Sequence, residues 1–219
     1  MIKLAMVGAL SLLMLSSACT DKNQNSGLPY LGNYDIVYNT VDGVKVADTV
    51  YPKVPSFTYT NQHGKTVKSS DMKGKVWVAD FFFSTCPTIC PIMTTQMKRL
   101  NTMTEDVNEH IQYLSFSINP EYDQPEILTK YIAHHGIEAK NWSFLTGNEA
   151  ETHALGVDHF LVHAASDEDS PGGFAHSPAF VLVDHEGYVR GVYVGTNTQD
   201  VDRLEKDLRK LLSIEYGIE

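Results

Sequence analysis

The sequence predicts an α/β fold in which a mixed central sheet is flanked by helices. Two observations carry this prediction. From about residue 76 to residue 158, apolar strand-like runs alternate with helix-like segments, as in strands joined by helical crossovers. The C-terminal part instead places two strand-like runs in succession, 179–183 and 188–194, before a final helix, which predicts an antiparallel pair.

Residues 76–83 form the predicted central strand, because this run is rich in valine and aromatic residues. The segment 84–86 then breaks the strand, and Pro87 fits the first turn of a helix, where its missing N–H costs nothing. Cys86 and Cys90 therefore lie where a central strand feeds a helix N-terminus, whose free N–H groups and dipole lower a thiol pKa. Two cysteines at this junction, together with the order of elements, imply a thioredoxin-like fold.

The other elements follow from the same kinds of signal. Segments 57–60 and 66–67 predict an N-terminal β-hairpin closed by a glycine turn, and 111–118 and 142–145 predict further strands. Helices are expected from Pro125 to His135, and from Asn148, paired as an N-cap with Glu151, to about Asp158. A final helix carries one apolar face, made of Val201, Leu204, Leu208, Leu211 and Leu212.

Two further expectations concern the segment before the last two strands. Residues 164–173 are acidic and contain Gly, Ser and Pro, which predicts a loop. In thioredoxin-like folds a cis proline often precedes the strand that faces the cysteines. Pro178 holds that place, so the Ser177–Pro178 bond is a candidate for the cis form.

The N-terminus has the features of a targeting segment. Lys3 precedes an apolar run, 4–15, that is too short to span a bilayer comfortably, and residues 1–18 are the predicted signal peptide. Cleavage after Ala18 would leave Cys19 first, as in a bacterial lipobox, so we expect lipidation of Cys19. Residues 19–50 are then a lipidated tether and an irregular or short-strand segment, and residues 51–219 the folded domain. This organisation predicts a protein of the bacterial cell envelope that is anchored to a membrane and faces the periplasm.

Charge and cysteine content narrow the function. The formal net charge of −10 argues against nucleic-acid binding and against adsorption to anionic lipid by charge. Of three cysteines, only Cys86 and Cys90 remain if Cys19 carries lipid. They are separated by about one helical turn, so both sulfurs can lie on one face and either close a disulfide or hold one soft metal ion. A buried structural disulfide is the plainer alternative.

Several motifs resemble those of the Sco/SenC copper proteins, over about residues 53–212. The segment 82–91 resembles the family's Cys-Pro-x-x-Cys-Pro signature, and 117–123 and 142–147 resemble its Asp-Pro-x-x-Asp and Trp-x-x-Leu-Thr-Gly stretches. His176 stands where the family carries its metal-binding histidine. Two positions depart from the pattern: Ala175 replaces an aspartate usually found before that histidine, and Asn119 stands where aspartate is common. Both departures concern residues that would contact the metal ligands or a partner protein, and neither of them removes a metal ligand.

The resemblance implies a metallochaperone rather than a turnover enzyme. Its metal would be copper, Cu(I) or Cu(II), held by the Cys86 and Cys90 thiolates and His176. Two soft sulfurs and one imidazole suit Cu(I) in particular. The implied partners are the copper-site subunit of cytochrome c oxidase, whose dinuclear site would receive copper or have its thiols reduced, and a copper donor.

Two alternatives share the fold. A thiol-disulfide oxidoreductase would use Cys86 and Cys90 as its redox pair, although such motifs usually have two intervening residues. A thiol peroxidase would need one low-pKa cysteine in a peroxide pocket, which this pair does not require.

Other candidate residues have simpler interpretations. Asp80 is either a paired buried acid or a functional group near the thiols. Met93 and Met97 are soft enough for copper, but their helical spacing indicates core packing. The spacing of His153, His159 and His163 is weak evidence for a second metal site.

Overall fold

A seven-stranded mixed sheet forms the centre of the protein, with strand order β11-β10-β5-β6-β7-β3-β4. The computed structural model describes residues 27–167 and 172–218, so the predicted signal peptide and Cys19 lie outside the described residues. The elements of this body are β3 (Thr58–Asn61), β4 (Thr66–Lys68), β5 (Val76–Phe82), α1 (Ile89–Met103), β6 (Ile111–Ser117), α2 (Pro125–His134), β7 (Trp142–Thr146), α3 (Glu149–Ala154), β10 (Ala179–Val183), β11 (Val189–Val194) and α4 (Thr198–Tyr216).

Strand β5 is an interior strand of the sheet, between β10 and β6, and all seven of its residues are buried. It runs parallel to β6, which runs parallel to β7, and it pairs antiparallel with β10 on its other side. A strand covered on both faces needs a nearly continuous apolar run, which residues 76–82 provide apart from Asp80. The mixed α/β sheet expected from the sequence is therefore confirmed.

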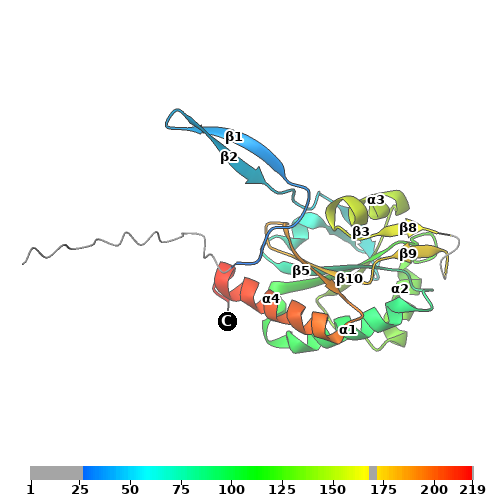
Figure 1. Cartoon of the computed structure of the whole chain (residues 1–219). Coiled ribbons are helices and arrows are strands. Elements are labelled where there is room, and N and C mark those ends of the chain that lie inside the picture. Colours follow the sequence, from blue (N-terminus) through cyan, green and yellow to red (C-terminus); the bar gives the residue numbers. More distant parts are fainter. Residues whose placement is uncertain (1–26, 168–171, 219) are drawn as a thin grey trace, which may run out of the picture.

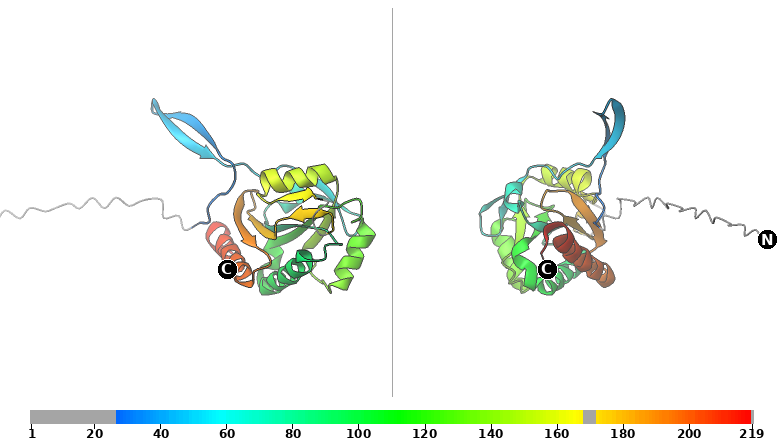
Figure 2. Two further views of the ribbon diagram at one scale, coloured as in Figure 1. Left: turned by 45° about the vertical axis from the view of Figure 1, so that its right-hand side comes forward. Right: turned by 90° about the vertical axis from the view of Figure 1, so that its left-hand side faces the viewer.

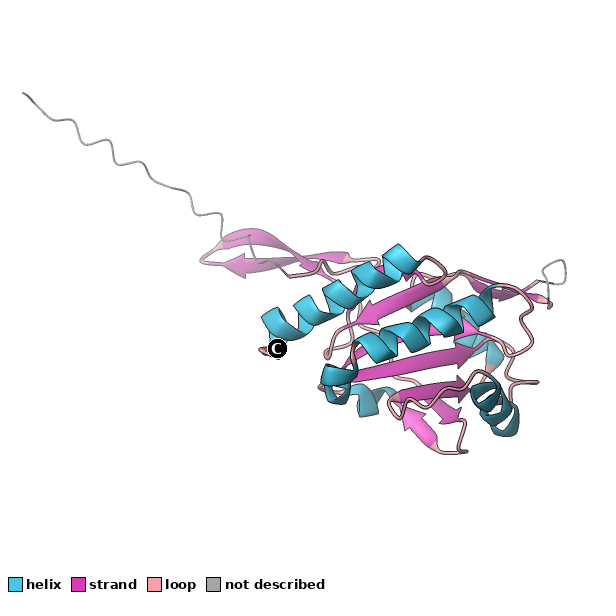
Figure 3. Cartoon of the chain, turned by 90° about the horizontal axis from the view of Figure 1, so that it is seen from below, coloured by secondary structure: helices cyan, strands magenta, loops and turns pink. Residues whose placement is uncertain are grey.

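The helices cover both faces of the sheet. Helices α1 and α4 lie side by side on one face, and α3 lies on the other (Figures 1 and 3). The buried side of α1 includes Met93 and Met97, neither of which is exposed to solvent, so both belong to the core as expected. The N-cap predicted for α3 is also present: the Asn148 side chain accepts a hydrogen bond from the Glu151 N–H at 3.0 Å.

A second hairpin occupies the segment near the N-terminus for which the sequence left irregular structure and short strands as alternatives. Strands β1 (Asp35–Val41) and β2 (Val44–Val50) pair antiparallel around the two-residue loop Asp42–Gly43. Both loop residues have positive φ, 51° and 79°, as a type I′ turn requires. The hairpin predicted at 57–67 also forms, but its strand β3 joins the main sheet next to β7.

The segment 164–173 is not a simple loop. Strands β8 (Ala164–Ser166) and β9 (Phe174–His176) pair antiparallel and form a small separate ribbon. Composition predicted a loop because each of these strands is only three residues long and the residues between them are polar or glycine. The cis expectation is wrong as well, since the Ser177–Pro178 bond is trans.

A buried ion pair fixes the start of the described chain. The Arg190 guanidinium donates to the Asp184 carboxylate at 2.9 Å and to the carbonyl oxygens of Leu28 and Pro29. Both partners of this ion pair are almost completely buried, and the backbone carbonyls accept further hydrogen bonds from the buried guanidinium. The backbone at residues 28–29 is thereby held against β11.

Candidate metal centre

The two cysteines lie on different structural segments. The N–H of Cys86 donates to the carbonyl of Phe83 at 3.1 Å, which closes a turn directly after β5. Helix α1 begins only at Ile89, so Pro87 precedes the helix and does not occupy its first turn. Cys90 lies in that first turn. Both thiols are free and buried, and Cys90 is 1% exposed.

His176 reaches the cysteines from the end of β9. The base of the β8–β9 ribbon is closed by two hydrogen bonds, since the backbone N–H of His163 donates to the Ser177 hydroxyl and the Ser177 N–H donates to the His163 carbonyl, each at 2.9 Å. This closure places His176 Nε2 at 3.2 Å from Cys90 Sγ. The side of the imidazole also packs against the Phe83 ring, with centroids 5.8 Å apart.

The three side chains predicted as ligands converge. The two sulfurs and one imidazole nitrogen lie within 4.8 Å of one another. Among residues 27–167 and 172–218, this is the only cluster of at least three Cys, His, Asp or Glu residues placed to hold an ion. Within these ranges, His153, His159 and His163 are not part of a cluster of this kind.

The imidazole is oriented for ligation through Nε2. His176 Nδ1 lies 3.2 Å from the Ser177 carbonyl oxygen. A carbonyl can only accept, so we assign the ring proton to Nδ1. The lone pair of Nε2 then points at the cysteines, which is the tautomer a metal ligand needs.

The local interactions shift the pKa values of the two thiols in opposite directions. A hydrogen bond from the Cys90 thiol holds the pKa of Cys86 far below its ordinary value, and nearby backbone N–H groups act in the same direction. The same hydrogen bond, together with burial, raises the pKa of Cys90. Cys86 is therefore the thiolate of the pair, and a soft cation that displaced the shared proton would find both sulfurs available.

A buried carboxyl group lies in the sheet beneath the centre. Asp80 on β5 stands opposite Ser115 on β6, whose hydroxyl donates to Oδ1 at 2.5 Å. The Trp142 indole in turn donates to the Ser115 hydroxyl at 2.9 Å. Burial raises the pKa of Asp80 to about 7 against the opposing effect of the Ser115 hydrogen bond, so this acid is largely protonated below neutral pH.

A second buried acid holds the loop that carries Cys86. Asp123 accepts hydrogen bonds from the backbone N–H of Ser84 at 3.1 Å, from the Ser84 hydroxyl, and from the Ser117 hydroxyl at 2.5 Å. The end of β5 is thereby tied to the turn after β6. In the sequence, residues 117–123 stand out only through the family resemblance. The contact with Ser84 arises only in the fold, which brings the two turns together.

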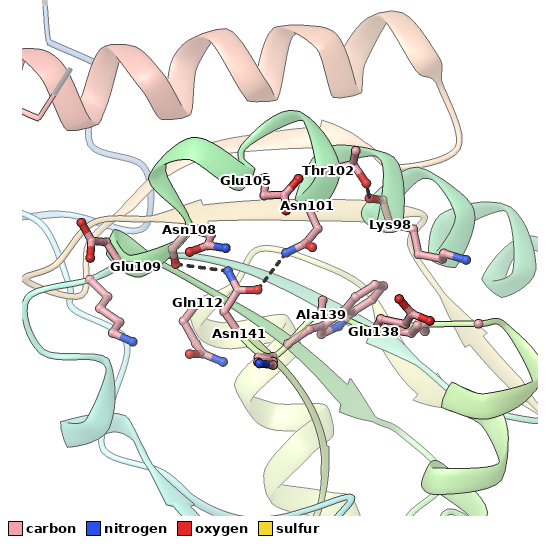
Figure 4. A pocket seen from close by; sticks show the side chains of 15 residues that line it. Lys98, Asn101, Thr102, Glu105, Asn108, Glu109, Gln112, Glu138, Ala139 and Asn141 are labelled. Carbon is pink, nitrogen blue, oxygen red and sulfur yellow. Dashed lines mark hydrogen bonds between the residues drawn. The ribbon is translucent and has the colours of Figure 1, made fainter.

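The hollow shown in Figure 4 lies at the opposite end of the sheet from the cysteines. The hollow has a volume of about 710 Å³. Its lining includes Lys75, just before β5, and Gln112 and Trp142, near the starts of β6 and β7. A hydrogen bond of 2.9 Å between the Asn101 and Asn141 side chains crosses it. Cys86 and Cys90 follow the other end of β5, so this hollow offers no binding space for a substrate of the thiols.

The fold and the convergent side chains define a thioredoxin-like protein with a Cys-Cys-His centre. The SCO1/SenC family model matches residues 47–213, and the chain belongs to this family. The resemblance noted in the sequence is thereby confirmed.

Individual relatives agree with this assignment. The chain is 36% identical over 170 residues to the SCO1 protein homolog of Bacillus subtilis, a match that covers 76% of this chain and 86% of that protein. A SCO1/SenC family lipoprotein from Bacillus anthracis superposes with a TM-score of 0.67 at 34% identity, covering 73% of this chain and 94% of that structure. BsSco, described as a member of the Sco family of cytochrome c oxidase assembly proteins with a disulfide switch, gives 0.64 at 34% identity, covering 72% and 91%.

Proposed function

We propose that this protein is a membrane-anchored copper-binding factor that delivers copper to, or maintains the thiols of, the dinuclear copper site of cytochrome c oxidase during assembly. The observation that carries the proposal is the convergence of Cys86, Cys90 and His176. Two sulfurs and one imidazole nitrogen form a soft, three-membered donor set that suits Cu(I). The unprotonated Nε2 of His176 and the thiolate of Cys86 are prepared for ligation without rearrangement of the sheet. ScoI of Bradyrhizobium japonicum, which shares the fold at 20% identity and a TM-score of 0.61 over 73% of this chain and 99% of that structure, was solved with copper bound.

The proposed location is the bacterial cell envelope, with the lipid on Cys19 as the membrane anchor and the domain facing the periplasm. Within the described part of the chain, no helix has the length and apolar character needed to cross a bilayer. The Bacillus anthracis relative is described as a lipoprotein, which supports a lipid anchor for this chain too. The proposed partners are the copper-site subunit of the oxidase and a copper donor.

Thiol-disulfide exchange is the second candidate function. It is favoured by the unequal pKa values of the two thiols, since a thiolate at Cys86 is the form that attacks a disulfide. The disulfide switch named for BsSco supports the same chemistry in a relative.

Anaerobic Cu(I) titration of the domain lacking residues 1–19, with thiol state followed in parallel, tests the first proposal. We expect one copper per chain and loss of free thiols on binding. His176→Ala should weaken copper binding by roughly two orders of magnitude, because the site loses one of three ligands. Oxidation of Cys86 and Cys90 to a disulfide should remain nearly unchanged, since that reaction needs only the two sulfurs.

The matched control is His63→Ala, which removes an exposed histidine from the β3–β4 turn and should leave the titration as in the parent. Copper binding by His176→Ala with parental affinity would show that His176 is not a ligand. Full oxidase assembly in cells by the same variant would favour thiol-disulfide exchange as the main role.

A further inference from the structure

The β1–β2 hairpin projects from the body of the protein (Figures 1 and 2). Every residue of both strands is exposed to solvent, including the large apolar ones. A two-stranded ribbon is at best marginally stable in water, and three or more strands are normally needed to support one another. Within residues 27–167 and 172–218, the hairpin therefore has no neighbouring strand that would complete it.

The tight loop determines which backbone groups remain unpaired. In a hairpin closed by two residues, the flanking pair is hydrogen bonded and the pattern alternates along the strands. Val41 and Val44 flank the loop. The N–H and C=O groups of every second residue on β1, counted from Thr40, consequently point away from β2. These residues are Ile36, Tyr38 and Thr40, and we call them the β1 edge.

The two edges of the hairpin differ in chemistry. On β2 the outward residues are Lys45, Ala47 and Thr49, and a lysine is one of the devices that protect an edge strand from pairing. The β1 edge carries no charge and consists of residue types that favour strands. Its central residue, Tyr38, is 69% exposed. The β1 edge is therefore the unprotected one.

We propose that the β1 edge pairs antiparallel with the β1 edge of a second copy of this chain, about a twofold axis at Tyr38. In this register Tyr38 faces Tyr38 of the second copy, and Ile36 faces Thr40. Asp35 then lies opposite Val41, so no like charges meet. The two hairpins would form one four-stranded antiparallel sheet, which removes the exposed edge from both copies.

The same features argue against other occupants. Insertion into lipid would leave two open strand edges without hydrogen-bond partners, which a bilayer does not tolerate. A basic protein recognised through charge would find no charge on the β1 edge.

The association should be reversible. A single strand pair of seven residues buries less than the roughly 800 Å² per partner of a standard stable interface. The chain's net charge of −10 also opposes self-association, so the dimer should become stronger, not weaker, as salt screens this repulsion.

Cross-linking of the whole chain in its bacterial host tests the proposal. Cys86→Ser and Cys90→Ser first remove the two thiols of the centre. Tyr38→Cys is then compared with Ala47→Cys, its cross-strand neighbour on the same face of the hairpin. In the proposed sheet the two positions 38 lie about 5.5 Å apart. The two positions 47 are separated by three strand spacings, about 14 Å. A bismaleimide linker shorter than about 14 Å can then join the two positions 38 but not the two positions 47. It should give at least about tenfold more covalent dimer for Tyr38→Cys than for Ala47→Cys.

The amount of cross-linked dimer is measured in whichever cell fraction contains the chain. The result therefore does not depend on whether the chain is anchored to a membrane. The background chain without an added cysteine reports any reaction at position 19. Equal cross-linking at the two positions, or a product with the mass of a different protein, would overturn the proposal.

A proline pair provides a second test that does not depend on cysteine. Tyr38→Pro removes an outward N–H without removing a hydrogen bond inside the hairpin, and Ala47→Pro does the same on the other edge. Sedimentation equilibrium of the whole chain in mild detergent should show at least a tenfold weaker dimer for Tyr38→Pro and no change for Ala47→Pro. Identical behaviour of the two variants, or a parent that is monomeric at every concentration and salt tested, would refute strand pairing through β1.

Discussion

Replacing Asp80 by asparagine should change how the stability of the protein depends on pH. The carboxyl group is buried between β5 and β6, and its pKa rises from 3.8 in the unfolded chain to about 7 in the fold. Between these two values the folded state keeps a proton that the unfolded state releases. The free energy of unfolding of the parent therefore falls as pH rises through this window, and no further change from this group is expected above pH 7.

The size of the effect follows from the shift. Roughly three pKa units at 1.36 kcal/mol each correspond to about 4 kcal/mol lost between pH 4 and pH 8. Asparagine has nearly the same shape, can still accept the hydrogen bond from Ser115 and does not ionise. We therefore expect Asp80→Asn to gain up to about 4 kcal/mol relative to the parent over that range.

Urea unfolding of the reduced, metal-free protein at several pH values, followed by tryptophan fluorescence, measures this difference. Asp158→Asn is the matched control, because Asp158 is exposed and should be hydrated alike in both states. Parallel stability curves for Asp80→Asn and the parent between pH 4 and pH 8 would refute the reasoning, and would mean that Asp80 is ionised in the fold at low pH.

Three further predictions concern other parts of the chain. Cys86 and Cys90 should form a reversible disulfide with a reduction potential above about −300 mV, measured in glutathione buffers, and a bond that resists mild reductant would indicate a structural role. Mass spectrometry of the membrane fraction should find an acylated N-terminal Cys19, whereas an unmodified soluble N-terminus would contradict the anchor. Asp184→Ala should destabilise the fold by about 3–5 kcal/mol, because it removes the buried carboxylate that pairs with the Arg190 guanidinium at 2.9 Å. A loss below about 1 kcal/mol in urea unfolding would show that water reaches this site.

The sequence predicted the body of the fold because its apolar patterns are strong. The fully buried β5 is apolar at every position except Asp80, and the helix after it repeats buried residues at helical spacing. The cysteines could be placed from this local pattern alone. His176 could not, since it is 86 residues away from Cys90, and only the family resemblance singled it out.

The features that the sequence did not reveal depend on pairing or on distant contacts. Strands β1 and β2 are exposed on both faces, so they lack the alternation of buried and exposed residues that marks a strand. Strands β8 and β9 are three residues long, too short for any period. The hydrogen bonds that Asp123 receives from Ser84 and Ser117 join turns whose proximity only the sheet register creates.

The three metal-binding side chains come from parts of the chain that are far apart in sequence, and this affects the lifetime of the protein in the cell. Cys86 and Cys90 come from one end of β5 and α1, and His176 comes from the β8–β9 ribbon, so the complete donor set exists only in the folded chain. Any ion that needs all three donors stabilises the fold by mass action, by about 4 kcal/mol when the free ion is present at a thousand times its dissociation constant. Proteases act on the unfolded fraction, which shrinks by the same factor of about a thousand. The abundance of this protein in the cell would then report on the supply of its own metal.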